Sequence, residues 1–397
     1  MVPNGWKAIT LGDLVTDSAF GPRFSSDLYS ENGAIGTIRT TDLCDEGTIN
    51  YNTIPYANLG IDEFKSHILD SGDLLITRSG TCGIPCIFEK QDKPIIAGAF
   101  LIRFKLKSDV DASYLHYLLK YDVTQHHISK MASGGVQKNL TGTSLKKLKL
   151  EVPEHKEQRK IAKILSTWDK AITTTERLID NSKQQKKALM QQLLTGKKRL
   201  LDDSGKPFKG VWEEVTVDQL CQVGRGRVIS KKEINENQGQ YPVYSSQTMN
   251  NGVMGSIGTY DFDGEYATWT TDGANAGTVF YRKGKFNCTN VCGTLKPKDL
   301  GVLNTQFLAL SLSLVTYKYV SHTLANPKLM NGVMKSVAFS IPCIQEQEKI
   351  ASVLTNADKE IELLEQQLAD LKQEKKALMQ QLLTGKRRVK VDDEAAA

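Results

Sequence analysis

A twelve-residue sequence, KKALMQQLLTGK, occurs twice in the chain and limits the possible folds more than any other feature. The two copies occupy residues 186–197 and 375–386 of a chain of 397. The same spacing along the chain relates Pro153 to Pro342 and the run Glu157–Ala162 to Glu346–Ala351. Self-similarity at a fixed spacing is typical of a chain built from repeated structural units. The sequence therefore predicts two halves of similar fold.

A weaker repeat opens each half. Trp6–Leu11 resembles Trp212–Val217, and the spacing between these two runs is larger than that between the tail copies. The halves therefore differ in length ahead of their nearly identical ends, and we expect variable bodies to alternate with constant tails. The predicted boundaries are 1–152 for the first body, 153–199 for the first tail, 200–341 for the second body, 342–388 for the second tail and 389–397 for a C-terminal segment.

Both tails are predicted to be long helices. No Pro or Gly lies between residues 154 and 195, and apolar residues recur at spacings of three and four, which is typical of a coiled-coil seam. A helix of about 40 residues rises roughly 60 Å. A solvated surface helix is the simpler alternative, but so long a one-sided stripe needs a partner, and the other tail supplies one. The predicted pairing residues are Ile161, Leu165, Trp168, Ile172, Ile179, Leu189, Leu193, Ile350, Leu354, Ile361, Leu364, Leu368, Leu371, Leu378 and Leu382.

The bodies are predicted to mix helices and strands. Runs at 73–77, 100–106, 266–270 and 278–282 are broken by Gly and Asn and are typical of strands, whereas 114–121 and 305–319 favour helices. The predicted fold class is α+β. It has two globular α/β bodies separated by two long helices that pair as an antiparallel coiled coil, with an internal pseudo-twofold repeat.

Composition narrows the class of protein further. Hydrophobic residues make up 40% and charged residues 24% of the chain, close to the average for a globular protein. No apolar run approaches the roughly 20 residues of a membrane span, and the first residues lack the layout of a signal peptide. Seven cysteines are too few and too scattered for a disulfide scaffold. We expect a cytoplasmic protein that does not enter a membrane.

The sequence offers no recognisable catalytic motif. No P-loop, dinucleotide-binding, zinc-protease or nucleophile-elbow motif occurs. The Asn-Pro-Pro-aromatic stretch of amino-methyltransferases is also missing, because Asn326-Pro327-Lys328 lacks the second Pro and the aromatic residue. We therefore expect no catalytic residue in this chain.

Two cysteine pairs and one acidic cluster are the candidates for metal binding. Cys82–Cys86 and Cys288–Cys292 are each spaced by three residues, but no His lies close to either pair, so small buried thiols explain them better than zinc. A solvated loop explains the acidic cluster of Asp42, Asp45 and Glu46 as well as a metal does. We expect no metal site.

Polar loops interleaved with Gly occur in both bodies. Arg, Lys, Asn, Gln, Ser and Thr are the side chains that contact phosphates and base edges in DNA. Each one alone is more often an ordinary turn residue, and the grouping in both bodies is the better signal. The candidate DNA-binding residues are Arg23, Ser25, Ser26, Arg39, Thr40, Thr41, Arg78, Ser79, Lys138, Asn139, Arg225, Arg227, Lys231, Ser245, Ser246, Gln247, Thr271, Asn275, Asn326 and Lys328.

These features together resemble the DNA specificity subunit of type I restriction–modification systems. Each tail opens with Pro and Glu-Gln-x-x-Ile-Ala and closes with Leu-Leu-Thr-Gly-Lys, and the resemblance extends from residue 6 to about residue 388. The bodies add shorter phrases that are similar to the family: Phe20-Gly21-Pro22, Arg39-Thr40-Thr41-Asp42, Gly72-Asp73-Leu74-Leu75 and Asn326-Pro327-Lys328-Leu329.

The resemblance implies a function and a set of partners. In this family each body is a target recognition domain that reads one half of a split, asymmetric site in double-stranded DNA, and the helices set the gap. Modification subunits, expected in two copies, dock on the helices, bind S-adenosylmethionine and methylate adenine N6 after flipping it out. A restriction subunit that translocates DNA with ATP and Mg can join them. The specificity subunit itself is expected to carry no cofactor and no catalysis.

The distribution of charge indicates how tightly the chain binds DNA, and the identical residues of the two tails indicate what the tails do. Residues 151–200 hold 12 basic and 6 acidic side chains, an excess equal to the net charge of +6, whereas the first body is near neutral. Because phosphate neutralisation drives tight DNA binding, we expect the chain alone to bind DNA weakly and in a salt-sensitive way. The tails could serve only as a spacer, but Lys187, Gln191 and Gln192 recur outside the seam, which favours a docking surface; recent duplication is the other explanation of this identity.

Two other classes of function remain open. The first is an enzyme whose body hides a nuclease or methyltransferase, which the missing motifs disfavour. The second is a coiled-coil scaffold with no role on DNA, which the Arg-bearing loops of both bodies disfavour.

Overall fold

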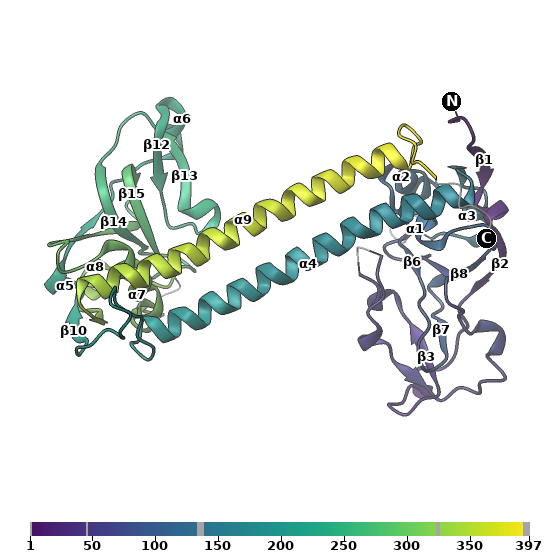
Figure 1. Cartoon of the computed structure of the whole chain (residues 1–397), viewed down its shortest axis with the longest axis horizontal. Coiled ribbons are helices and arrows are strands. Elements are labelled where there is room, and N and C mark those ends of the chain that lie inside the picture. The colour runs from purple at the N-terminus through teal and green to yellow at the C-terminus, as the bar shows by residue number, and fades with distance from the viewer. Residues whose placement is uncertain (1, 45–46, 133–138, 323–325, 392–397) are drawn as a thin grey trace. The chain divides into compact units, whose positions relative to one another are not determined.

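The computed structural model describes residues 2–44, 47–132, 139–322 and 326–391 (Figure 1). They form two compact units, Met1–Thr175 with Gln367–Ala397, and Glu176–Gln366. Each unit therefore combines one body with the start of that body's own tail and the end of the other tail. This crossed arrangement determines the contacts described below.

The first body contains two main sheets. One has the strand order β2-β8-β5-β6, and the other has the order β4-β3-β7 with β3 and β7 parallel. Strand β1 pairs with β9, which joins the two ends of the body. The elements are β1 (Lys7–Thr10), β2 (Val15–Phe20), β3 (Ile35–Ile38), β4 (Tyr56–Ala57), β5 (Leu74–Thr77), β6 (Pro85–Ile87), β7 (Ile95–Ala97), β8 (Leu101–Leu106), α1 (Ala112–Lys120), α2 (Asp122–Met131), α3 (Gly142–Lys146) and β9 (Lys149–Val152).

The second body contains one six-stranded sheet of order β11-β16-β14-β15-β12-β13. Strand β10 pairs with β17, as β1 pairs with β9 in the first body. The elements are β10 (Glu213–Thr216), α5 (Val217–Leu220), β11 (Cys221–Arg225), α6 (Lys231–Glu236), β12 (Gln238–Tyr244), β13 (Val253–Ile257), β14 (Phe262–Thr270), β15 (Val279–Cys288), β16 (Cys292–Pro297), α7 (Thr305–Val315), α8 (Asn331–Ser336) and β17 (Ala338–Ile341).

The two bodies share one strand plan. The three antiparallel strands β2-β8-β5 correspond to β11-β16-β14, and the parallel pair β3–β7 corresponds to β12–β15. The long strand β15 takes the places of both β6 and β7, because it pairs with β14 along most of its length and with β12 at its end. The predicted α+β class with an internal repeat is confirmed.

The change in the spacing of the repeat can be located in the fold. The carbonyl of Ile38 accepts a hydrogen bond from Gly98 N–H, and the carbonyl of Tyr244 accepts the equivalent bond from Thr289 N–H. Ile38 and Tyr244 are as far apart along the chain as Trp6 and Trp212. Thr77 and Thr270 are likewise equivalent but lie closer together along the chain. The first body therefore carries extra chain between β3 and β5, where β4 and several short turns lie.

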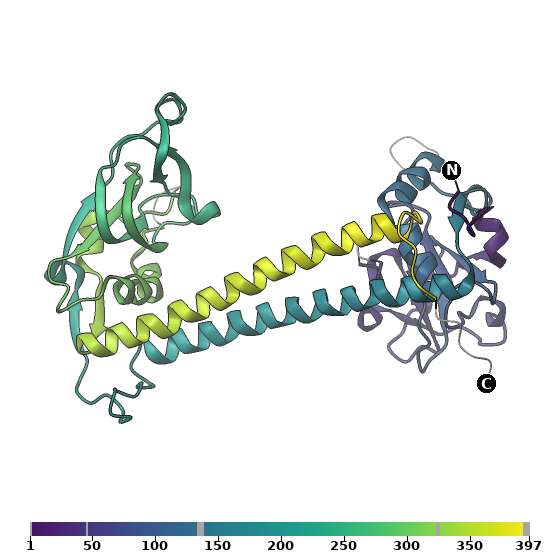
Figure 2. The same cartoon turned by 45° about the horizontal axis from the view of Figure 1, so that its top comes forward.

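The tails form the helices α4 (His155–Leu193) and α9 (Ile344–Leu382). Within each unit the two helix segments run side by side in opposite directions (Figures 1 and 2). Lys375 pairs with Asp169 in the first unit, and Lys186 pairs with Asp358 in the second. These pairs are related by the repeat of the tails. Each cation therefore bonds to the other copy of the tail.

A matching arginine just after each long helix bonds to the first turns of the other long helix. Arg388 forms two hydrogen bonds of 2.7 Å to the carboxylate of Glu157. Arg199, its counterpart in the repeat, forms two of 2.6 Å to Glu346. Both glutamates are buried, and such bidentate pairs are strong and specific in geometry. Each tail therefore ends against the start of the other tail.

The cores of the bodies include the ends of the predicted seam. Ile161 and Leu165 of α4 and Leu382 of α9 join the apolar core of the first body. Leu193 of α4 and Ile350 and Leu354 of α9 join that of the second. Other members of the predicted track, such as Leu364, Leu368 and Leu371, remain half-buried. The terminal turns of each helix thus anchor bodies as well as pairing with the other helix.

Candidate nucleic-acid interface

The predicted DNA-binding loops lie on the same backbone framework in both bodies. In the first body Arg78 N–H donates to the carbonyl of Phe100, and Leu140 N–H donates to the carbonyl of Arg78, both at 2.9 Å. In the second body Thr271 N–H donates to Val291 at 3.0 Å, and Leu329 N–H donates to Thr271 at 2.9 Å. The loops around Arg78 and Thr271 are therefore structurally equivalent.

Glycines allow close backbone approach at the same point in each framework. A Cβ on Gly21 would lie 2.2 Å from the carbonyl oxygens of Ala97 and Gly98. A Cβ on Gly226 would lie 2.1 Å from the carbonyl oxygen of Cys288. Both positions exclude any larger residue, which accounts for the glycine in the phrase Phe20-Gly21-Pro22.

Each framework surrounds a cavity lined by equivalent segments. The cavity of the first body has a volume of about 570 Å³, and its lining includes residues 39–41 and 98–100. That of the second body has about 460 Å³, and its lining includes residues 245–247 and 289–291. Arg23, Arg39, Thr40 and Thr41 line the first cavity, and Ser245, Ser246, Gln247 and Asn275 line the second. The structure thus gathers eight predicted residues from separate loops around two equivalent cavities.

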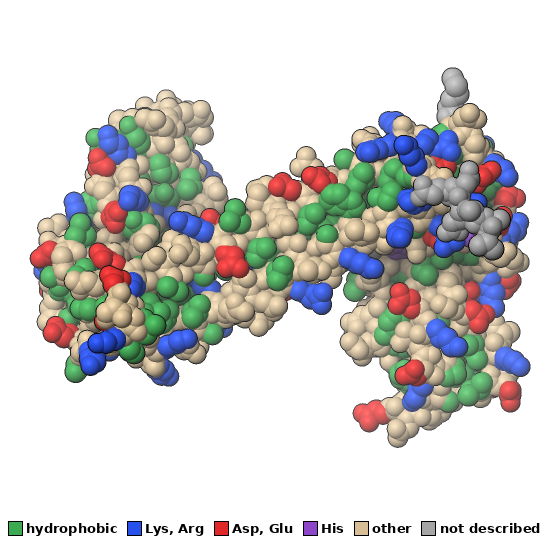
Figure 3. Space-filling view, in the orientation of Figure 1, with side chains coloured by type: hydrophobic (Ala, Val, Ile, Leu, Met, Phe, Trp, Pro, Cys, Tyr) green, Lys and Arg blue, Asp and Glu red, His purple; other side chains and the backbone are tan. Residues whose placement is uncertain are grey.

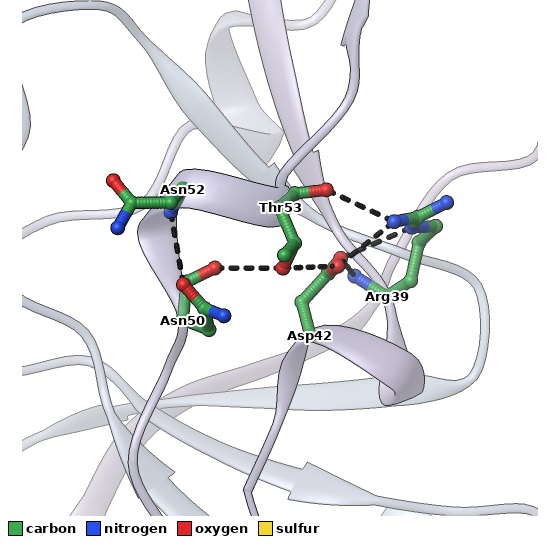
Figure 4. Close-up of polar contacts among 5 residues, drawn as sticks. All are labelled: Arg39, Asp42, Asn50, Asn52 and Thr53. Carbon is green, nitrogen blue, oxygen red and sulfur yellow. Dashed lines mark hydrogen bonds and ion pairs between the residues drawn. The ribbon is translucent and has the colours of Figure 1, made fainter. Parts of the chain in front are cut away.

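Arg39 lines the first cavity. A buried carboxylate, that of Asp42, holds its side chain (Figure 4). Asp42 is only 1% exposed and accepts bonds from Arg39 Nε at 3.1 Å and Nη2 at 2.8 Å, and from the Thr53 hydroxyl at 2.9 Å. Hydrogen bonds to the Asp42 carboxylate raise the pKa of the Arg39 guanidinium, which stays charged and half-exposed. The interpretation of Asp42 as a solvated loop residue is wrong, and Asp45 and Glu46 lie outside the described residues.

Arg78 lies beside the same framework. Its guanidinium carbon is 4.3 Å from the centre of the Phe20 ring, and its Nε donates a long bond of 3.4 Å to the Asn139 side chain. The backbones of Ser79 and Asn139 form an isolated antiparallel β-bridge. Ser25 and Ser26 are exposed at a short turn near Arg23, with Ser25 capping the turn through Asp27. Lys138 lies outside the described residues.

The second body has a charged cluster of its own beside its cavity. Arg225 donates to the Asn290 carbonyl, and its Nη2 lies 3.6 Å from Asp272 Oδ2. Lys328 lies 3.6 Å from the other oxygen of Asp272. Thr271 is fully buried and donates to Asp272 at 2.7 Å, so it supports this cluster rather than facing a ligand.

The remaining candidates of the second body differ in their freedom to bind DNA. Arg227 pairs with Glu233 at 2.7 Å and with Asp261 at 3.1 Å, which raises the pKa of its guanidinium and neutralises its charge locally. Lys231 is exposed in the first turn of α6, and Asn326 is exposed two residues before Lys328. Lys231 and Asn326 are free of such pairing in the described contacts, whereas Arg227 acts mainly as structural support.

The described ranges contain no group of three His, Cys, Asp or Glu side chains that could hold a metal ion. Cys288 and Cys292 are both buried, with their sulfur atoms 3.5 Å apart. Cys86 is buried in the first body, and burial raises the pKa of its thiol to about 12. None of the helices in the described residues has the length and apolar character of a membrane span.

Sequence reasoning missed three residues of these sites. Phe100 and Val291 occupy equivalent positions at the tips of the two loops, and Asp272 joins Arg225 to Lys328. The tips are equivalent because Leu101 bonds to Gly98 as Cys292 bonds to Thr289. Their spacing along the chain matches neither repeat visible in the sequence.

Two bodies that hold different polar side chains on one backbone framework define a protein with paired recognition domains. The chain belongs to the family of the type I restriction modification DNA specificity domain, whose model matches residues 3–182 and 210–373. Members of this family recognise DNA and perform no catalysis themselves, so this chain is a non-catalytic, DNA-recognising specificity subunit.

Relatives support this assignment. A Mycoplasma pneumoniae protein named as a type I specificity subunit is 40% identical over 217 residues, which cover 54% of this chain and 77% of that protein. The specificity subunit of the type I restriction enzyme MpnII from the same organism is 46% identical over 143 residues, covering 36% of this chain and 43% of that one.

Solved structures show the same fold at low sequence identity. The S subunit of a type I restriction–modification system from M. genitalium is 16% identical with a TM-score of 0.63, covering 96% of this chain and 99% of that chain. The HsdS subunit from Thermoanaerobacter tengcongensis is 14% identical with a TM-score of 0.52, covering 97% and 98%.

Proposed function

We propose that each body reads one half of a bipartite, asymmetric site in double-stranded DNA. The observation that carries this proposal is the pair of equivalent cavities with different linings. Arg39 and Thr41 in the first body stand where Ser245 and Gln247 stand in the second. A shared framework with different donors and acceptors suits two readers of different base sequences. A symmetric site would instead need two identical linings.

The first test is methylome sequencing of cells that express the chain with its cognate modification subunit. We expect a split adenine motif whose two halves differ. Replacing residues 211–340 with the second body of a relative should change one half of the motif and leave the other half and the gap unchanged. A matched replacement of residues 7–152 should change only the opposite half. A change in both halves from either replacement would contradict independent readers.

We further propose that modification subunits dock on the repeated part of the tails, in two copies. Lys187, Gln191 and Gln192 are exposed on α4, and their repeat counterparts Lys376, Gln380 and Gln381 are exposed on α9. Other identical residues of the repeat are explained by packing, since Leu193 and Leu382 lie in the cores of the bodies. Figure 3 shows Lys and Arg side chains gathered over the C-terminal end of α9. Two equivalent exposed surfaces suit two copies of one partner.

Native mass spectrometry of the assembled complex tests this stoichiometry. Changing Lys187, Gln191 and Gln192 to Glu should remove one modification subunit, and changing both sets should remove two. Gln185→Ala is the matched control, because it is exposed on α4 but differs from Glu374 at the repeat position. If the complex still holds two modification subunits after one set and after both sets are changed, this docking site is wrong. The cofactors S-adenosylmethionine, ATP and Mg are proposed to belong to partner subunits.

A further inference from the structure

Exposed aromatic side chains of the first body gather at its cavity. Among its described residues, the exposed aromatic side chains are Phe20, Tyr29 and Phe100, and Phe100 is the most exposed at 56%. Tyr29 and Phe100 line the cavity, and the Phe20 ring lies under the Arg78 guanidinium. A single exposed apolar residue needs no explanation, but two exposed aromatic rings in the lining of one cavity, with a third under the nearby Arg78 guanidinium, indicate a ligand with flat faces.

The loop that carries Phe100 is held firmly. Gly98 N–H donates to Ile38 at 2.8 Å, Leu101 N–H donates to Gly98 at 2.9 Å, and the Phe100 carbonyl accepts from Arg78 at 2.9 Å. Gly21 packs directly against the backbone of Gly98. The loop tip therefore has little freedom to rearrange, and the ring stays exposed on a rigid support.

Arginines lie near this loop. Arg23 and Arg39 line the same cavity as Phe100, and Arg78, whose backbone is bonded to Phe100, carries its guanidinium over the Phe20 ring. Proteins that open a base step in DNA combine an apolar or aromatic side chain, which stacks on bases, with cations that contact nearby phosphates. A duplex supplies both the flat faces and the negative charge that this surface would bind.

The second body lacks the aromatic feature. Its equivalent loop tip carries exposed Asn290 and half-buried Val291. The exposed aromatic residues described in that body are Tyr260 and Tyr317, and neither lines its cavity. At this loop tip the first body therefore offers an aromatic ring for stacking and the second body does not. This difference adds to the difference in their hydrogen-bonding groups.

We propose that Phe100 stacks on a base within the half-site read by the first body, opening one base step there, and that the second body makes no equivalent insertion. This inference rests on the proposed function, because it requires the first body to face a half-site. It adds to that function a specificity-determining residue that reads how easily a base step unstacks, rather than its hydrogen-bonding groups.

The test uses the assembled complex of this chain with its modification subunits, on DNA carrying the motif found by methylome sequencing. 2-Aminopurine is placed in turn at each position except the methylated adenine, where base flipping would itself raise the fluorescence. We expect one step in the first half-site to brighten with wild type and to stay dark with Phe100→Ala. Affinity for the site should fall about 5- to 150-fold, the range for loss of one aromatic–base stack.

Two further variants keep the outcome interpretable. Phe100→Trp retains an aromatic face and should keep both the fluorescence and the affinity. Ile61→Ala removes another exposed apolar side chain of the first body that does not line the cavity, and should change neither. Equal affinity of Phe100→Ala and Ile61→Ala with an intact motif would overturn the stacking role while leaving the reading function standing. Absence of any split motif with wild type would instead overturn the proposed function.

Discussion

Asp42 is the carboxylate on which the edge of the first cavity depends. It accepts bonds from the Arg39 backbone and guanidinium and from Thr53, and it is almost fully buried. Because Arg39 is half-exposed and water can solvate its charge, the main cost of removing the Asp42 charge is the weakening of these charge-assisted hydrogen bonds, about 2 kcal/mol. We expect Asp42→Asn to lower the local free energy of unfolding by that amount, measured by hydrogen exchange of peptides from residues 35–57.

Asp27→Asn is the matched control, because Asp27 is exposed and bonds only to its neighbour Ser25 in the described contacts. Its effect should stay within about 0.5 kcal/mol. Equal protection of the two variants would mean that Arg39 is held by other contacts.

His116 gives the first unit a dependence on acid. Burial, together with Lys120, lowers the pKa of His116 from 6.5 to about 4, so the folded state keeps the ring neutral while the unfolded chain protonates it. Stability contributed by neutral His116 is therefore complete above pH 6.5 and is lost as the pH falls towards 4. One pKa unit corresponds to about 1.4 kcal/mol, so wild type should lose about 2 kcal/mol between about pH 7 and about pH 5 from this residue.

His116→Gln removes the titrating ring and should flatten that part of the stability profile. Urea unfolding at the two pH values, followed by peptides of α1, measures it. His127→Gln serves as the control, because His127 is exposed on α2. An unchanged acid dependence in His116→Gln would place the sensitivity elsewhere.

Residue identity at the site was predictable only in part. Arg39, Thr40 and Arg78 stand out in the sequence because polar residues group in the Gly-bearing loops of both bodies. Phe100 and its equivalent Val291 do not stand out, because an apolar residue beside a strand normally indicates a core position. Their equivalence also depends on a spacing that changes with the extra chain between β3 and β5.

Among the elements, the ends of the two long helices offer a matched comparison. Gly385 and Gly196 both have a positive φ, of 65° and 68°, as a helix C-cap requires. A Cβ on Gly385 would lie 2.5 Å from the Pro3 ring, whereas one on Gly196 would lie 3.3 Å from Trp212. Each Ala variant should cost about 1 kcal/mol for the backbone conformation, and Gly385→Ala should cost more because of the contact with Pro3.

Hydrogen exchange resolved by unit measures this difference. We expect Gly385→Ala to expose peptides around Trp6, and Gly196→Ala to affect only peptides around Trp212. A larger effect of Gly196→Ala would show that Pro3 moves aside at little cost.

The helices themselves were predictable, but their attachments were not. Spacings of three and four indicate that Ile161 and Leu382 need a partner, yet nothing in that pattern distinguishes a facing helix from a body. The bond from Arg388 to Glu157 joins residues far apart in the chain and leaves no local signal. The one sequence signal of an additional contact is that the repeat stays identical past the end of each helix, where a coiled-coil seam no longer requires it.

For the whole molecule, weak binding to DNA is predicted because several candidate Arg and Lys side chains are already paired with carboxylates. Arg225 and Lys328 share Asp272, and Arg227 is paired twice, so few candidate cations remain free for phosphates. We expect the isolated chain to bind a duplex in the range of non-specific binding, with Kd about 10⁻⁴ to 10⁻⁶ M at physiological salt, and to lose it as salt rises. Fluorescence anisotropy from low to high salt measures this. Tight, salt-insensitive binding would contradict the expectation.

The crossed construction of the units also sets an order of synthesis. The second unit is one continuous stretch, Glu176–Gln366, so all of it leaves the ribosome before the residues that complete the first. Until Leu378, Leu382 and Leu383 arrive, the apolar surface around Trp6 and Ile161 has no cover. At about 5 to 20 residues per second, a delay of roughly 200 residues leaves the nascent first body incomplete for roughly 10 to 40 seconds. The part of the protein made first is therefore the last to finish folding, and chaperones have most to protect there.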